Sequence, residues 1–388
     1  MRHLSWPITA IFSLGLLSSC MGKDSKVNYP KGYFDKDHTV ISVNPNEEYY
    51  DSVFKALPNP ELIVLQENDS IIFAEISKII SKENRFFILD QYGSRTAVSF
   101  NADGTPLAKY GCIGQGPGEY VRPWDMDIID SCVYILDSNL KKVIRYDING
   151  KYLSEKPIPF IADAFTVLHN KNIVFNLYPD GEGGAQLCLT DSNINVIENF
   201  LPSEKGYTGG WGTDNVFRKF NDRVSYYRAP LDTIIVFDKD MAPTSSLTFD
   251  FGARSIPDEA KLDFIAGSED NKLEGTWMLV DSPIPLAGGL LAGIIHENRK
   301  QYTFIANPEN NRIGMKSSDS RKSVFDIMEP CASDEEGNLI SYTSLEFIEN
   351  LEDFDSLDET VKKGLRDTNR VLIIYPFAKL NSQSPKTE

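Results

Sequence analysis

The sequence predicts an all-β fold, a six-bladed β-propeller made of four-stranded antiparallel blades. Three observations support this prediction: two segments of the chain repeat each other, strand-like runs recur roughly every 40–50 residues, and glycine-rich turns separate these runs. The 22 Phe and 17 Tyr residues also fit strands, because aromatic rings pack well on a pleated surface. With 388 residues, of which 41% are hydrophobic, the chain can form such a ring around a folded core.

The clearest repeat relates a segment that begins at Arg85 to one that begins at Cys132. Each segment contains an aromatic residue, then Ile-Leu-Asp, a polar turn, a valine-bearing strand and a turn of the Asp-Gly or Asn-Gly type. Such turns suit hairpins because their backbone needs positive φ. Asp90 occupies the same place in the first segment as Asp137 in the second. We expect both side chains to cap the turns that follow them; the alternative is a metal or acid–base role.

The number of blades follows from the spacing of less clear units at 171–200, 222–252 and 288–314. Six blades would each be longer than the ~40–50 residues typical of such repeats, so seven blades are the alternative. We attribute the excess length to insertions, one of which predicts a short helix near 356–366. Its apolar residues recur at helical spacing, with acidic residues early and basic residues late.

The two ends of the propeller are expected to meet in one blade. The segment ELIVLQ (61–66) and the terminal segment RVLIIYPF (370–377) both have the apolar composition of strands. Pairing them would close the ring and remove two exposed sheet edges.

The N-terminus has the composition of a bacterial export signal. Arg2 precedes an apolar stretch, Ile8–Leu17, that is shorter than the ~20 residues a membrane-spanning helix needs. Leu17-Ser18-Ser19-Cys20 is similar to the bacterial lipobox, which implies cleavage before Cys20 and acylation of its thiol; an ordinary signal peptide is the alternative. The expected organisation is a signal peptide (1–19), a lipid anchor and tether (20–45), the propeller (46–382) and a disordered tail (383–388).

The net charge of −17 argues against nucleic acid as a partner, because such a surface repels phosphate backbones. Membrane contact is expected through the lipid anchor only, and we expect a monomer. Four cysteines follow Cys20, and their spacing matches no zinc pattern. We expect them to be buried free thiols, although an exported chain could form disulfides; they are Cys112, Cys132, Cys188 and Cys331.

The stretch GCIGQGPGEY (111–120) invites comparison with phosphate-binding loops. It lacks the third glycine of a dinucleotide loop and the Lys-Ser/Thr of a Walker loop, and Pro117 removes a backbone donor. We instead expect a structural turn where the chain leaves an outer strand and returns to the centre of the disc. The carboxylate of Glu119 would then accept neighbouring amides. The residues of this turn are Gly114, Gly116, Pro117, Gly118 and Glu119.

Candidate chemistry gathers at Trp124-Asp125-Met126-Asp127, where a strand should enter the disc near the mouth of the channel. We expect Asp125 and Asp127 to point to opposite faces of that strand, so that they cannot share one ion. No metal is therefore predicted, and calcium or zinc in the channel remains the alternative. The three histidines beyond the signal, His38, His169 and His296, show no ligand spacing.

Aromatic and basic residues supply candidates for a recognition surface. Such side chains stack on sugar rings and on peptide side chains. The alternative is that they fill the gaps between blades. With Asp125 and Asp127, the candidate ligand-binding residues are Trp124, Trp211, Tyr227, Arg228 and Trp277.

The repeat at 133–153, Val-Tyr-Ile-Leu-Asp through Val-Ile-Arg-Tyr-Asp-Ile-Asn-Gly-Lys-Tyr-Leu, resembles the NHL-type propeller repeat. Together with the lipobox, GQGPGEY, YYRAPLDTII and TNRVLIIYPF, it resembles the six-bladed β-propeller lipoproteins of Bacteroidota. The resemblance implies a fold and an address in the cell envelope, on the periplasmic or the exposed side of the outer membrane. It supplies no catalytic residues.

The function predicted from these observations is a lipid-anchored binding module for a glycan, a peptide or another envelope protein. It follows from the anchor, the fold and the lack of a recognisable catalytic set, since no Gly-x-Ser-x-Gly motif is present. The alternative is a propeller hydrolase, lactonase or lyase with a metal in its channel, which depends on fold analogy.

Overall fold

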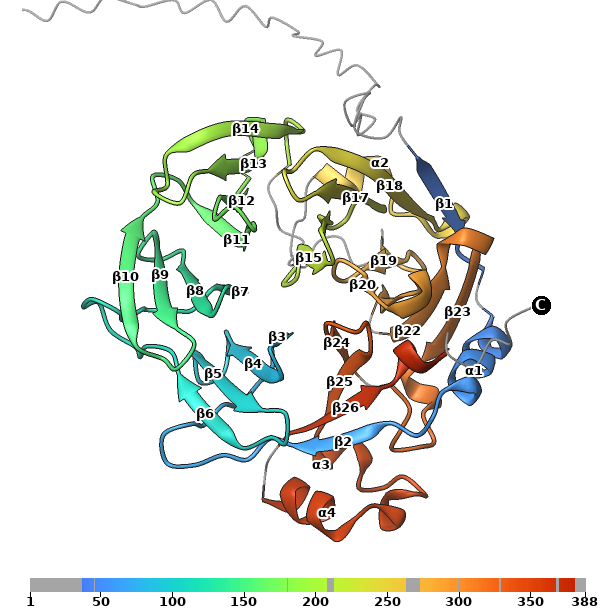
Figure 1. Ribbon diagram of the computed structural model, residues 1–388. Coiled ribbons are helices and arrows are strands. Elements are labelled where there is room, and N and C mark those ends of the chain that lie inside the picture. The colour runs from blue at the N-terminus through green and yellow to red at the C-terminus, as the bar shows by residue number, and fades with distance from the viewer. Residues whose placement is uncertain are drawn as a thin grey trace, which may run out of the picture.

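The computed structural model describes residues 37–380, apart from 45, 180, 208–212, 263–272, 299, 328 and 368–369. Six antiparallel sheets stand around a central axis as the blades of a propeller (Figure 1). The six-bladed prediction is confirmed. We call the blades A to F, in the order in which their inner strands follow along the chain.

Blades A, B and C each consist of four consecutive strands. Blade A contains β3 (Lys78–Lys82), β4 (Arg85–Asp90), β5 (Thr96–Asn101) and β6 (Pro106–Lys109). Blade B contains β7 (Asp125–Ile129), β8 (Cys132–Asp137), β9 (Lys142–Asp147) and β10 (Tyr152–Pro157). Blade C contains β11 (Ala162–Val167), β12 (Ile173–Leu177), β13 (Gly184–Thr190) and β14 (Val196–Ser203).

The other three blades depart from this plan. Blade D contains β15 (Phe217–Phe220), β16 (Arg223–Tyr226), β17 (Thr233–Asp238) and β18 (Pro243–Asp250), with β1 (His38–Ser42) added outside β18. In blade E, β19 (Met278–Leu279) and β20 (Ile284–Pro285) both pair with β21 (Leu291–Glu297), followed by β22 (Lys300–Asn307) and β23 (Arg312–Ser317). Blade F contains β24 (Glu329–Ser333), β25 (Leu339–Thr343), β26 (Val371–Tyr375) and β2 (Glu61–Val64).

The two ends of the ring meet in blade F, as predicted. Strand β2 pairs antiparallel with β26, from Glu61 opposite Ile374 to Val64 opposite Val371. The N-terminal strand therefore forms the outer edge of a blade whose other strands come from the C-terminal part of the chain.

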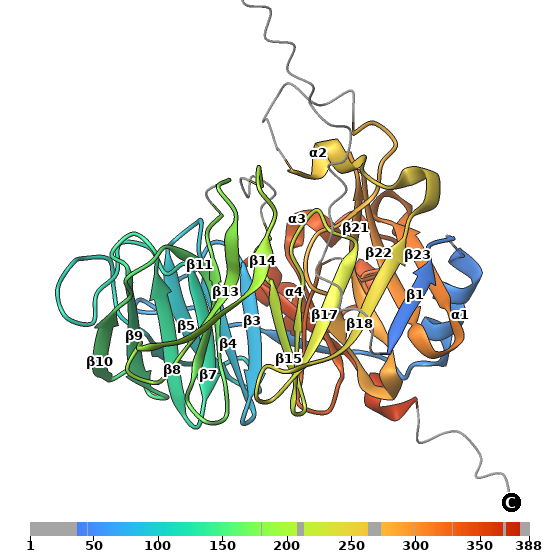
Figure 2. The ribbon, with the colours of Figure 1, turned by 90° about the horizontal axis from the view of Figure 1, so that it is seen from above.

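The chain before β2 runs around the outside of blades D and E. Strand β1 pairs parallel with β18, and helix α1 (Glu47–Ala56) packs on β23 (Figure 2). A Cβ atom on Gly314 of β23 would lie 2.5 Å from the backbone nitrogen of Tyr50, so glycine allows the helix to lie directly on the strand. We call residues 38–64 the N-terminal belt.

The belt corrects the expected boundary of the tether at 20–45, because 38–42 form a strand. No local pattern could indicate this strand, since its partner lies about two hundred positions away along the chain. Helix α1 was not predicted either. It carries ordinary helix signals, namely a cap at Asn46, two acids in its first turn and Lys55 in its last.

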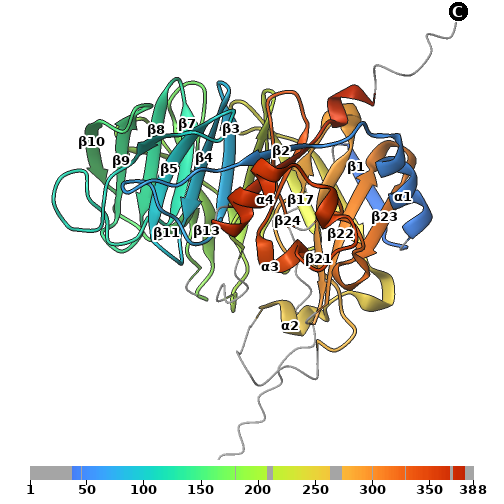
Figure 3. The same ribbon diagram turned by 90° about the horizontal axis from the view of Figure 1, so that it is seen from below.

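The predicted helical insertion is present between β25 and β26. Helix α4 (Glu359–Arg366) begins after Asp358, whose side chain accepts the backbone N–H of Thr360. The helix lies beside β2 (Figure 3), and its buried residues Val361 and Leu365 pack in a cluster that includes Val64 of that strand.

The remaining helical elements are short. They are α2 (Asp258–Leu262), α3 (Leu345–Ile348) and single 3₁₀ turns at Gly252–Arg254, Ala287–Gly289, Pro308–Asn310, Ser318–Ser320, Phe354–Ser356 and Phe377–Lys379. None of the helices in the described part of the chain is long and apolar enough to cross a bilayer. The four cysteines after Cys20 are free, and Cys188 is buried while Cys112 is exposed.

The two faces of the disc carry different connections. On one face, which we call the linker face, each outer strand connects to the inner strand of the next blade. On the other, the hairpin face, a short turn joins each inner strand to the second strand of its own blade.

The glycine stretch is the linker between β6 of blade A and β7 of blade B, as predicted. Its contacts are made within the protein: the carboxylate of Glu119 accepts the backbone N–H of Gly116 at 2.8 Å, and the hydroxyl of Tyr146 donates to the carbonyl of Gly118 at 2.8 Å. Gly118 has a φ of +74°, and a Cβ atom there would lie 2.8 Å from the ring of Tyr152. The linker therefore packs tightly against blade B.

Truncation after Asn369 tests the closure of the ring. This change removes β26 and leaves β25 and β2 without their shared partner, so we expect Tm to fall by roughly 10 °C or more. Calorimetry measures the effect, and a chain that ends at Leu380 serves as the control, with an unchanged Tm. An unchanged Tm for the chain that ends at Asn369 would contradict the closure.

Substitution of the linker glycines tests the turn. Gly118→Ala should destabilise the fold by about 1–3 kcal/mol, because alanine is strained at this φ and its methyl group would collide with Tyr152. Gly116→Ala is the matched control. Its Cβ atom would meet only the end of the Glu119 side chain at 3.0 Å, so urea denaturation should show a smaller loss. Equal losses would refute this account.

Candidate functional site

The repeated aspartates Asp90 and Asp137 hold turns together. Asp90 accepts the backbone N–H groups of Gly93 and Ser94 in the following turn, and that of Ala74 in the preceding linker. Burial opposes its ionisation, but these hydrogen bonds and that of the Ser94 hydroxyl outweigh burial and lower its pKa. Asp137 likewise accepts amides from its own turn and from the linker before β7. The turn-capping interpretation is confirmed for both.

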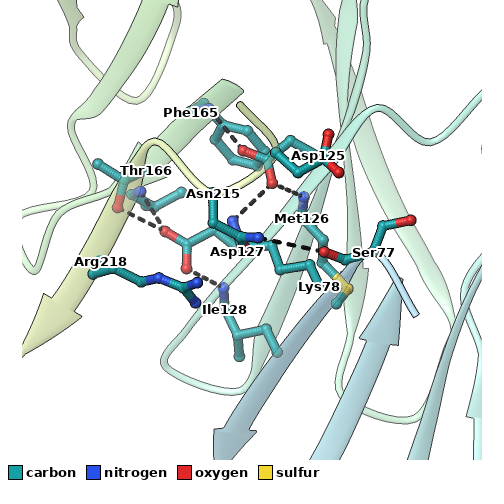
Figure 4. A network of polar contacts seen from close by, with 12 residues as sticks. Ser77, Lys78, Asp125, Met126, Asp127, Ile128, Phe165, Thr166, Asn215 and Arg218 are labelled. Carbon is teal, nitrogen blue, oxygen red and sulfur yellow. Dashed lines mark hydrogen bonds and ion pairs between the residues drawn. The ribbon is translucent and has the colours of Figure 1, made fainter. Parts of the chain in front are cut away.

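Asp125 and Asp127 point to the same face of β7, which corrects the expectation that they face apart. Residues two positions apart share one face of a strand, and this face is turned toward blade C. Asp125 accepts the backbone N–H of Phe165 at 2.9 Å (Figure 4). Asp127 accepts the backbone N–H of Val167 at 2.7 Å. The two carboxylates thus satisfy donors on the inner edge of β11.

Lysines from two other blades reach the same carboxylates. Lys78 of blade A donates to Asp125 at 2.7 Å, and Lys219 of blade D lies 2.7 Å from Asp127 (Figure 4 shows the first pair). Burial raises the pKa of Asp125 despite Lys78. Burial also opposes ionisation of Asp127, but Lys219 and Lys78 outweigh it and lower the pKa of that carboxyl. Four blades therefore meet in one polar network on the axis.

Arg218 connects this network to blades E and F. Its guanidinium donates to the carbonyls of Ser282 at 3.2 Å and Cys331 at 2.6 Å, and it lies 4.0 Å from the carboxylate of Asp281. Asp281 in turn accepts the backbone N–H and the side-chain amide of Asn215. All six blades thus contribute atoms to the axis.

Side chains from opposite blades also meet near the linker face. Tyr92 of blade A donates to Asp214, which precedes blade D, at 2.8 Å, and the guanidinium of Arg122 stacks on Tyr92 and on Trp124. Burial and the neighbouring charge of Asp281 raise the pKa of Asp214 to about 6. These contacts cross the axis above the Asp125–Lys78 pair.

A cavity of about 310 Å³ occupies the axis on the other side of this network. Its lining residues come from inner strands and from the turns on the hairpin face. Lys78, Arg218, Lys219 and Asp127 lie at its inner end, and Lys82, Asp130, His169, Asp334 and Glu335 lie at its rim. The cavity is therefore reached from the hairpin face. We call it the axial cavity.

A match to a family model covers residues 33–376. The chain belongs to this family, whose description is "Domain of unknown function (DUF4934)". A comparison with curated proteins finds no match. The family membership therefore agrees with the propeller domain but names no activity.

Three solved structures are similar to this chain to different degrees. A Bacteroides fragilis protein described as exported is 16% identical, with a TM-score of 0.69 over 88% of this chain and 99% of that chain. A DUF4221 member from Bacteroides vulgatus is 12% identical, with a TM-score of 0.49 over 82% of this chain and 97% of that chain. A streptogramin B lyase is 10% identical, with a TM-score of 0.43 over 82% of this chain and 99% of that chain. The similarity to the Bacteroides fragilis protein shows the fold alone.

The other predicted ligand residues occupy different places in this DUF4934 domain. Tyr227 and Trp277 are buried between blades D and E, and the Tyr227 hydroxyl donates to the carbonyl of Leu279. Arg228 pairs with Glu204 at 2.6 Å and lines a separate cavity of about 50 Å³, with room for a few water molecules. Trp211 and Cys20 lie outside the described residues.

Lysines and an arginine on the axis were not among the candidate residues predicted from the sequence. Their signal was weak but present: Arg218 and Lys219 interrupt an aromatic strand, and Lys78 opens an apolar one. Among described residues, no group of three His, Cys, Asp or Glu side chains is placed to hold a metal ion. The axial carboxylates are instead paired with cations.

The Asp127→Asn substitution tests the polar network. It leaves Lys219 without its carboxylate, so we expect a loss of roughly 2–4 kcal/mol in the free energy of unfolding. Asp130→Asn, at the end of the same strand, is the matched control, because its exposed pair with Lys171 should contribute little. Urea denaturation measures both, and an Asp127 variant as stable as its control would overturn the role of the network.

Proposed function

We propose that this DUF4934 protein is a lipid-anchored binding module of the cell envelope, which holds a ligand in the axial cavity. The observation that carries the proposal is the cavity itself: it is about 310 Å³ in volume, it opens on one face, and its polar groups are already ordered by contacts between blades. Small-molecule sites are typically concave, largely preformed and lined by apolar walls with a few fixed polar groups.

The envelope address is supported by the N-terminal sequence. The lipobox-like segment ending at Cys20 would anchor the chain, and the similar Bacteroides fragilis protein is described as exported. The NHL-like repeats and the outer-membrane location belong to the same proposal.

Binding is favoured over catalysis by the pairing of the axial carboxylates. A general base or a metal ligand needs a carboxylate with free lone pairs facing the substrate. Here Asp125 and Asp127 each accept backbone amides of blade C and contact a lysine. Their hydrogen-bonding capacity is used to hold the blades together.

A glycan and peptide binding screen on residues 24–388 tests the proposal. We expect ligands whose binding is lost in Ser81→Trp, because the indole would fill part of the axial cavity without touching the ion pairs. Asn149→Trp adds the same side chain at an exposed turn and should bind normally. Thermal unfolding of each variant verifies that it is folded.

Two results would contradict the proposal. Binding that survives Ser81→Trp would place the ligand outside the axial cavity. Stoichiometric calcium or zinc in the purified protein, with a fall in Tm on chelation, would favour a metal-dependent hydrolase, lactonase or lyase instead.

A further inference from the structure

We infer that the axial cavity selects a small organic carboxylate with an apolar body. This inference rests on the proposed function, because it names the ligand class of the same cavity. It follows from the charge at the inner end of the cavity, the composition of its wall and its volume.

The inner end of the cavity presents more cations than anions. Lys78, Arg218 and Lys219 line it, whereas Asp127 is the one carboxylate among the described lining residues at this depth. Asp125 and Asp281, which contact Lys78 and Arg218, do not line the cavity. An entering ligand therefore meets the cations while these two counter-charges lie behind them.

Lys78 is the cation best placed to take a ligand. Its ammonium group has three N–H donors, and one of them donates to Asp125. Within the described chain, the other two have no hydrogen-bond acceptor. The side chain is 11% exposed, so an anion bound there would be largely shielded from water, which strengthens a charge-assisted hydrogen bond.

Each carboxylate of the rim already has a partner within the protein. Glu335 pairs with Lys82 at 2.7 Å, and Asp130 pairs with Lys171. Asp334 is occupied by the backbone N–H groups of Glu336 and Asn338 in its own turn. Asp125, Asp127 and Asp281 balance the three cations of the inner end, but Lys78, Arg218 and Lys219 face the cavity whereas Asp125 and Asp281 do not.

The wall between the rim and the inner end combines apolar and polar side chains. Its apolar part is formed by Ile80, Ile128, Phe165 and Phe217, and Ser81 and Thr166 lie beside them. A ligand that fits must place one anionic group on the lysines and an apolar body against these side chains. A volume of about 310 Å³ lies at the lower end of the range for small-molecule pockets, so the body is no larger than one or two rings.

Titration calorimetry with benzoate and its neutral isostere benzamide tests this inference on residues 24–388. We expect benzoate to bind at least about tenfold more tightly than benzamide, since the charged hydrogen bond separates them, and to bind more weakly as salt is raised. Lys78→Met should weaken benzoate binding about tenfold or more. Lys151→Met, which removes an exposed positive charge on a turn of the hairpin face, should not change it.

A second variant keeps the test valid if Lys78→Met fails to fold, because that change leaves Asp125 without its lysine. Ser81→Trp preserves the ion pairs, and it should abolish benzoate binding. Benzoate binding that persists in this variant would place the anion elsewhere and overturn the inference.

Other outcomes separate the inference from the proposed function. Equal affinity for benzoate and benzamide would refute the role of charge, and tighter binding of glucuronate than of benzoate would refute the apolar body. No binding of any of these acids would overturn the ligand class. The proposed function would survive that result if the glycan and peptide screen still yielded ligands lost in Ser81→Trp.

Discussion

The inner strand of every blade has one edge that faces the axis and pairs with no further strand. The donors and acceptors on this edge must be satisfied by something other than a sheet. In this protein two carboxylates of β7 take the amides of Phe165 and Val167 on β11, and lysines from blades A and D neutralise the carboxylates. The same constraint that the fold imposes therefore places ordered charges at the inner end of the axial cavity.

The ring itself is not regular. Blades D and E have β1 and α1 on their outer sides, and blade F takes its outer strand β2 from the N-terminal belt. In the described part of the chain, blades A, B and C consist of their four consecutive strands alone. The inner strand of blade E is divided into β19 and β20, and the segment between them supplies Asp281 and Ser282 to the axis. The division of this inner strand therefore occurs where blade E contributes to the polar network.

The parts of the structure that could be predicted from sequence depend on local signals. Each of these signals involves only a few neighbouring residues. They are the Asp-Gly and Asn-Gly turns, the alternating apolar strands, and the helical spacing of Leu357, Val361 and Leu365. They were sufficient for the propeller, its closure and the helix α4. The capping role of Asp90 and Asp137 followed from the repeat in the same way.

The candidate site could be predicted only in part, because it joins residues that are far apart in the chain. Asp125 and Asp127 were identified as candidates, but Lys78 and Lys219 lie 47 and 92 positions from them, and no pattern in a single sequence links such pairs. The orientation of the two aspartates was misjudged, although period-two alternation determines it. Strand β1 was assigned to the tether because its partner, β18, is also far away in the sequence.

The N-terminal belt also bears on how the chain reaches its folded state. Strand β1 pairs with residues near position 248, and β2 pairs with β26 at positions 371–374, so both strands of the belt depend on partners that lie far along the chain. Contacts of such long sequence separation slow folding, because loop-closure entropy is lost before the contacts form. Since blades A, B and C each consist of four consecutive strands, we expect them to form first and the ring to close last, when β2 and β26 pair.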